Sequence, residues 1–102
     1  MSEGDVSHGE LDALLGQVRQ LQLQAARQYQ PVVDDLLRTG SRDVQQIERT
    51  LDGLLDFCGY APVLAMYRRL CRHYWDIDPA ATADYIKAYR EQWDSEEDWG
   101  AA

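Results

Sequence analysis

Residues 11–40 read LDALLGQVRQLQLQAARQYQPVVDDLLRTG, and this stretch decides the fold. At 100° per residue its apolar side chains fall within an arc of about 120°, which is typical of an amphipathic helix. The arc keeps its phase across Pro31, which favours one helix kinked at Pro31 over two helices joined by a turn. Gly40 predicts the end of this helix through a left-handed cap. The side chains of the arc are Leu11, Leu14, Leu15, Val18, Leu21, Ala25, Tyr29, Val32, Val33 and Leu36.

A second helix follows directly after Gly40. Ser41 or Asp43 can cap its first turn, because short polar side chains accept hydrogen bonds from the unpaired amides there. Gly59 is the expected stop signal at its end. One narrow face of this helix holds Val44, Ile47, Leu51, Leu54, Leu55 and Cys58.

Two more helices complete the pattern. Pro62 suits the first turn of a third helix that runs to about Trp75. Asp78-Pro79 combines a capping carboxylate with a proline at the first helical position, which predicts a fourth helix ending near Trp93. No stretch alternates apolar and polar residues as a strand would. With short connections throughout, the sequence predicts an all-α, up-and-down bundle of four to five helices.

The length of 102 residues corresponds to a single domain. We expect a flexible N-terminus at residues 1–8, the helical bundle at residues 9–93 and an acidic tail at residues 94–102. No apolar run approaches the ~20 residues that a membrane span requires, and the acidic N-terminus does not resemble a secretion signal. Cys58 and Cys71 both lie in apolar helical patterns, so we expect reduced, buried thiols and a cytoplasmic protein.

The first helix is too long for its own bundle. About 30 residues would extend ~45 Å, whereas each of the other helices would extend ~20–25 Å. The helix either folds back at Pro31, which would give five short helices, or projects beyond the bundle. A projecting apolar stripe needs a partner, so a homodimer through residues 11–37 is one hypothesis, and Leu23 on the opposite face supports it.

The negative charge of the chain is unevenly distributed. The net charge is -8, with -5 in residues 1–60, +1 in residues 61–93 and -4 in residues 94–102. A chain this acidic should repel bulk nucleic acid and anionic membranes. Any such binding would have to use the neutral-to-basic middle segment.

Three arginines gather in that segment, on the side of the third helix opposite its apolar arc. Arg68, Arg69 and Arg72 form a guanidinium cluster of the kind that binds carboxylates or phosphates. His73 and Trp75 lie at its edges. The alternative interpretation is a solvated face whose arginines pair with nearby acids. On the fourth helix, Arg90 lies beside an apolar stripe formed by Thr82, Ile86, Tyr89 and Trp93.

Several functional classes find no support in the residues. Cys71 and His73 lie about 200° apart on a helix, so they cannot share a metal ion without distortion, and neither His8 nor Cys58 completes a ligand motif. The sequence contains no Gly-x-Ser-x-Gly motif, no glycine-rich phosphate loop and no pair of carboxylates bracketed by apolar residues. We therefore predict no catalytic residues, no metal and no cofactor. A helix-turn-helix is disfavoured because the fourth helix opens with small and acidic residues where base contacts would be made.

The acidic tail carries one large apolar side chain, Trp99, among four negative charges, the composition of an acidic docking peptide. This tail could also lie over the three arginines and mask them. We therefore expect a non-enzymatic protein-interaction module, such as an inhibitor, immunity-type protein or adaptor. A specific variant of this expectation is that its carboxylates imitate the charge of nucleic acid. The alternative is a nucleic-acid-binding module that uses the arginine and aromatic face. The candidate binding residues are Arg68, Arg69, Arg72, His73, Trp75, Arg90 and Trp99.

Overall fold

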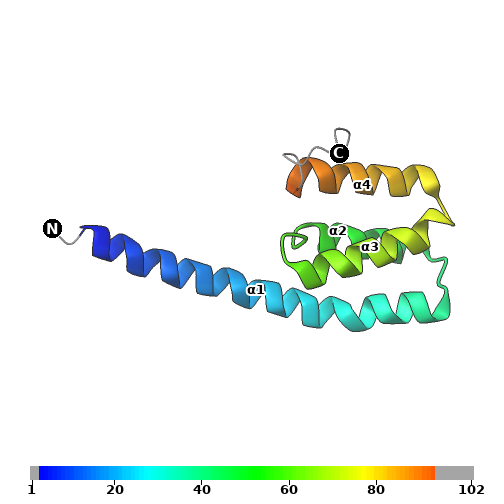
Figure 1. Cartoon of the computed structure of the whole chain (residues 1–102). Helices are drawn as coiled ribbons and strands as arrows, with labels where there is room; N and C mark the ends of the chain where they lie inside the picture. The colour runs from blue at the N-terminus through cyan, green and yellow to red at the C-terminus, as the bar shows by residue number, and fades with distance from the viewer. Residues whose placement is uncertain (1–2, 94–102) are drawn as a thin grey trace.

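The computed structural model describes the backbone of residues 3–93 and the side chains of residues 9–93. Four helices fill this range and it contains no strand: α1 (Glu3–Thr39), α2 (Val44–Leu55), α3 (Ala61–Trp75) and α4 (Pro79–Trp93). Figure 1 shows α2, α3, α4 and the second half of α1 side by side as a bundle. The predicted all-α bundle is confirmed, with four helices rather than five.

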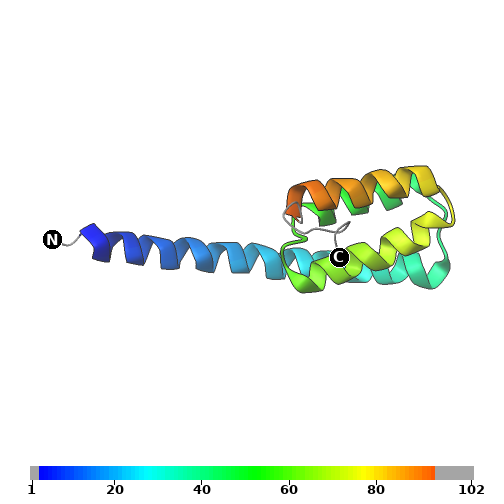
Figure 2. The ribbon, with the colours of Figure 1, turned by 45° about the horizontal axis from the view of Figure 1, so that its top comes forward.

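α1 is a single helix that continues through Pro31. It does not fold back, so its first half projects from the bundle, as Figures 1 and 2 show from two directions. The overall extents of 59 × 36 × 19 Å reflect this projection. α1 begins at Glu3, within the segment predicted to be flexible. The flexibility of residues 1–8 stays a prediction.

The predicted helix boundaries follow from local hydrogen bonds. Gly40 adopts a φ of 60°, and the Gly40 and Ser41 amides donate to the carbonyls of Leu37 and Leu36, which closes α1. The Asp43 carboxylate accepts from the Gln46 amide at 3.2 Å at the start of α2. At the start of α4, the Asp78 carboxylate accepts from the Ala81 amide at 3.0 Å. These signals fix the breaks near Gly40 and Asp78.

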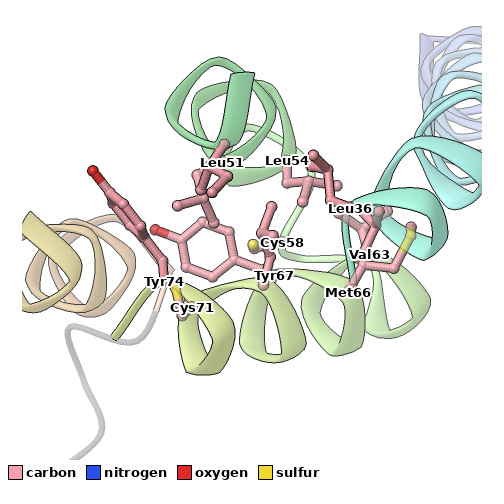
Figure 3. Close-up of a cluster of buried hydrophobic side chains, with 12 residues drawn as sticks. Leu36, Leu51, Leu54, Cys58, Val63, Met66, Tyr67, Cys71 and Tyr74 are labelled. Atoms are coloured by element: carbon pink, nitrogen blue, oxygen red, sulfur yellow. The ribbon is translucent and has the colours of Figure 1, made fainter. Parts of the chain in front are cut away.

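The core lies where the second half of α1, α2 and α3 meet. Figure 3 shows its side chains, with Leu51 and Leu54 from α2 facing Met66, Tyr67 and Tyr74 from α3. α4 covers one side of this core, and Thr82 is its single buried residue. α4 is therefore the peripheral helix of the bundle. The fully enclosed core members include Val33, Ile47, Leu51, Leu54, Val63, Leu70 and Tyr74.

The end of α2 differs from the prediction. The helix ends at Leu55, and turns at residues 56–59 carry the chain to α3, although Cys58 remains buried. Gly59 has no left-handed conformation. Its lack of a side chain admits the Trp93 ring instead, because a Cβ at residue 59 would lie 2.7 Å from that ring. The Trp93 indole N–H donates to the Leu55 carbonyl at 2.6 Å, which fixes the end of α4 beside the start of α3.

Replacing Gly59 by alanine should therefore loosen the end of α4. The added methyl group displaces the Trp93 ring, and we expect the free energy of unfolding to fall by about 1 kcal/mol. Urea denaturation measures this change. Gly16→Ala is the matched control, because nothing lies within 4 Å of a Cβ there. Helix propensity predicts a stabilising effect for that control, so equal losses in the two variants would contradict the packing role of Gly59.

Candidate functional site

The three arginines of α3 are all exposed, but they do not form one patch. Arg69 points toward α1, where its guanidinium lies 3.6 Å from the Asp34 carboxylate. Both side chains of this pair are about half exposed, so the ion pair contributes little stability. Arg68 and Arg72 instead line a pocket on the other side of α3.

This pocket lies between α3 and α4 and has a volume of about 680 Å³. Two guanidinium groups, from Arg68 and Arg72, and the Asp76 carboxylate are the charged groups in its lining. The two arginines are four positions apart in the sequence, so their side chains leave the same face of α3. The apolar lining comes from Leu64, Tyr67, Cys71, Trp75, Ile86 and Tyr89. The arrangement suits a ligand that combines an apolar group with negative charge.

Tyrosines hold the wall of the pocket in place. The Tyr67 hydroxyl donates to the Tyr85 carbonyl at 2.7 Å, which ties α3 to α4. The ring centroids of Tyr67 and Tyr89 lie 6.2 Å apart in a tilted arrangement. Trp75 is half exposed, with 50% of its surface accessible, and offers an indole face for stacking. The pocket therefore has a rigid wall and one accessible aromatic surface.

The remaining predicted site residues lie apart from this pocket. His73 contacts the Ser41 carbonyl through Nε2 at 2.6 Å, so it joins α3 to the loop before α2. Arg90 is exposed on α4 and takes part in an interaction of its own. Trp99 lies outside the described residues. The structure thus brings together Arg68, Arg72 and Trp75 from the predicted set.

Sequence reasoning missed the pocket residues Leu64, Ile86 and Tyr89. The sequence showed the apolar stripe of α4, which includes Ile86 and Tyr89, but gave no signal that the stripe would face α3. In the structure α4 packs at the edge of the bundle, and Ile86 is 39% exposed.

Both cysteines are free thiols inside the core. Burial raises the pKa of Cys71 to about 12, and burial together with the neighbouring Cys71 raises the pKa of Cys58 to about 12. Such thiols stay protonated at neutral pH and are poor nucleophiles. Among residues 9–93, no group of histidine, cysteine or acidic side chains could hold a metal ion.

The two thiols predict a loss of stability at high pH. Their pKa lies near 9.0 in the unfolded chain, so unfolding releases protons between pH 9 and pH 12 and the free energy of unfolding falls across that window. Burial also raises the pKa of Tyr67, which adds to the fall. Urea titrations at pH 8 and pH 10.5 measure it. In Cys71→Ala the free energy of unfolding should fall less between these two pH values. An equal fall would contradict the role of the Cys71 thiol in this pH dependence.

A second candidate surface is the projecting part of α1, residues 9–24, which we call the α1 arm. None of these residues is buried, and from Gly9 onward the first buried side chain of α1 is that of Ala25. Five apolar side chains form one stripe along the arm, each 48–56% exposed: Leu11, Leu14, Leu15, Val18 and Leu21. The stripe continues in phase into the bundle, where Val33 and Leu36 are buried. We call these five residues the arm stripe.

The arm corrects one sequence-based expectation. Residues 25–36 of the predicted interface are occupied by the chain's own bundle, so only the arm stripe remains for a partner. Leu14 and Val18 both lie outside the bundle, so replacing them by charged residues leaves the core untouched.

Comparison with known proteins does not assign the chain to a family. No protein-family model, curated protein or solved structure matches this chain significantly. Among the helices from Glu3 to Trp93, none has both the length and the apolar character to cross a membrane.

Proposed function

We propose that this chain is a non-enzymatic protein-interaction module that binds through the α1 arm. The observation that carries the proposal is the arm stripe, five half-exposed apolar side chains outside the bundle. An isolated helix of this length is marginal in water, because most helical stability in proteins comes from packing an apolar face. Gly9 and Gly16 weaken the arm further. A partner that covers the stripe would supply the missing stabilisation.

The partner we propose is a second copy of the chain, with the two arms antiparallel. Residues 3–12 carry four acids and neither lysine nor arginine, whereas residues 13–27 carry two arginines and no acid. A parallel pair would place acids beside acids, but an antiparallel pair places the acidic half of one arm beside the basic half of the other. When the two antiparallel stripes lie alongside each other over their full length, Leu11 of one copy pairs with Leu21 of the other, and Leu14 pairs with Val18.

The arm stripe is short, so this dimer belongs to the small, weak class of interfaces. Burial of each half-exposed side chain contributes about 1 kcal/mol, or about 10 kcal/mol gross for the ten side chains of a dimer. Association itself costs about 4–15 kcal/mol. We therefore expect a dissociation constant on the order of micromolar rather than nanomolar. An adaptor or inhibitor of this design would carry two bundles at opposite ends of a shared helical pair.

Disulfide trapping tests both the contact and its direction. Chains carrying Leu11→Cys are mixed with chains carrying Leu21→Cys, oxidised and digested, and the crosslinked peptides are identified by mass spectrometry. Antiparallel arms give the mixed crosslink between residues 11 and 21, and parallel arms give 11–11 and 21–21 instead. The native thiols are buried and do not compete. Crosslinks no more abundant than those of Ala13→Cys, on the opposite face of the arm, would refute the interface.

The α3–α4 pocket favours a second candidate function, single-stranded nucleic-acid binding. Arg68, Arg72 and Trp75 combine cations with a stacking surface, as such sites do. The pocket also contains the Asp76 carboxylate, and the chain as a whole has a net charge of -8. Retention on immobilised single-stranded DNA at physiological salt, lost on replacing Arg68 and Arg72 by alanine, would favour this function over the interaction module.

A further inference from the structure

We infer that the α3–α4 pocket binds a small amphiphilic carboxylate, an unbranched hydrocarbon chain that ends in a single carboxylate group. This site is separate from the arm stripe, and the inference does not depend on the proposed interaction function. The volume of about 680 Å³ lies within the range of about 300–1,000 Å³ that is typical of small-molecule sites. α3 with its C-cap Asp76 forms one side of the pocket, and α4 forms the other.

The deepest part of the pocket favours a hydrocarbon over a polar group. Its buried lining residues, which we call the pocket floor, are Tyr67, Cys71 and Thr82. The Tyr67 hydroxyl already donates to the Tyr85 carbonyl at 2.7 Å, and the Thr82 hydroxyl donates to the Asp78 carbonyl at 2.9 Å. A thiol such as that of Cys71 is only a weak donor. A polar group on the floor would therefore lose its water without gaining a strong hydrogen bond, whereas a hydrocarbon gains by leaving water.

The walls of the pocket are apolar and elongated. They come from Leu64 and Trp75 on α3 and from Ile86 and Tyr89 on α4. Trp75 and Ile86 are among the exposed large hydrophobic side chains of the bundle, so a bound chain would remove apolar surface from water. From Leu64 to Asp76 the lining follows α3 for twelve positions, or ~18 Å at 1.5 Å per residue. This shape suits an extended chain better than a compact ring.

The charged lining residues select the head group. Arg68, Arg72 and Asp76 are all exposed, and their charges sum to +1. Within residues 9–93 neither Arg68 nor Arg72 forms an ion pair with a carboxylate. A carboxylate between these two guanidinium groups would accept charge-assisted hydrogen bonds from both. Asp76 lies four positions beyond Arg72, where it would repel a second negative charge, so the lining favours a monocarboxylate over a polyanion.

Methyl NMR on the full-length chain, labelled at the isoleucine δ1 carbons, tests the inference with decanoate as the probe. Ile86 lines the pocket, whereas Ile47 is buried in the core. Decanoate should therefore shift the Ile86 signal and leave that of Ile47 in place. We expect a dissociation constant on the order of 100 micromolar, within the efficiency range of small ligands. From octanoate to decanoate the affinity should rise by up to about fourfold for each added methylene.

Two charge variants have opposite expected effects. Arg68→Ala/Arg72→Ala should raise the dissociation constant of octanoate by about tenfold, the effect expected for two exposed ion pairs. The same variant should bind octanol, which has the chain without the charge, as well as the original chain does. Asp76→Asn should lower the dissociation constant of octanoate by about twofold, because it removes a like charge from the lining. Asp76 caps α3 through its backbone N–H, so this replacement preserves the cap.

Arg69→Ala is the matched control, because Arg69 is exposed on α3 but lies beside Asp34 rather than in the pocket. Binding should be unchanged in that control and in Leu14→Glu/Val18→Glu, which distinguishes the pocket from the apolar arm stripe. The inference is overturned if the Ile86 signal does not respond to decanoate, or if either control weakens binding as much as the double arginine variant. It is also overturned if that variant loses octanol as strongly as octanoate. Tighter binding of a deoxythymidine oligonucleotide than of decanoate would assign the pocket to nucleic acid instead.

Discussion

Replacement of Tyr74 by alanine should lower the free energy of unfolding by about 3–5 kcal/mol, the largest loss expected for a single residue of this chain. Tyr74 has no accessible surface. Figure 3 shows its ring against the cluster near Leu51, with the hydroxyl directed outward. That hydroxyl donates to a Glu48 carboxylate oxygen at 2.5 Å, which ties α3 to α2. A small domain is stable by only about 5–15 kcal/mol, so the variant should be partly unfolded at physiological temperature.

Two further variants separate the contribution of the Tyr74 hydroxyl from that of its ring and compare Tyr74 with its exposed neighbour. Tyr74→Phe keeps the ring but leaves Glu48 without its donor, and should cost about 1–2 kcal/mol. Trp75→Ala removes a larger side chain from the adjacent position, but half of its surface is exposed, and it should cost less than about 1 kcal/mol. Urea denaturation followed by circular dichroism measures all three. A Trp75→Ala loss as large as that of Tyr74→Ala would mean that α4 and the pocket, rather than the α2–α3 contact, dominate stability.

The second large effect is expected at the arm. Leu14→Glu/Val18→Glu introduces two carboxylates per chain into the arm stripe, and burying them against a second copy would require costly desolvation. We expect the dissociation constant of the dimer to rise by at least about 100-fold, equivalent to roughly 2.7 kcal/mol. The free energy of unfolding of the bundle should stay within about 0.5 kcal/mol of the original chain, because both side chains lie outside it.

Ala13→Glu/Gln20→Glu provides the matched control for this variant. It adds the same charge to the opposite side of the arm, where both residues are exposed. Analytical ultracentrifugation over a concentration series compares the two. If the control weakened association as strongly as the stripe variant, general charge repulsion rather than the arm stripe would explain the result.

Much of the fold could be predicted because its signals are local. Gly40, Asp43 and Asp78 mark helix ends through hydrogen bonds to neighbours no more than a few residues away. The periodicity of α1 likewise revealed one stripe in one phase. Its division into an exposed arm and a buried half depends on how far α2 and α3 extend along α1, which is a tertiary property. Pro31 was ambiguous for the same reason, since a proline is compatible with a continued helix when packing on both sides of it is favourable.

The candidate site was predictable only in part. The sequence singled out Arg68, Arg72 and Trp75 as neighbours on one helix, and the structure places them together. Arg69 belonged to the same cluster by spacing, but α1 packs against α3 so that Asp34 lies beside it. Ile86 and Tyr89 come from α4 and complete the pocket only through the α3–α4 contact. Such partners, 14 or more residues distant along the chain from Arg72, leave no periodic signal.

Sedimentation equilibrium of the full-length chain tests the central claim most directly. The measurement covers protein concentrations from 1 to about 200 micromolar, a range that brackets the expected dissociation constant. The arm interface predicts an average mass that rises with concentration from 11.7 kDa toward twice that value, while Leu14→Glu/Val18→Glu stays at 11.7 kDa throughout. A single species of 11.7 kDa across the whole range for the original chain would contradict the claim that a second copy covers the arm stripe.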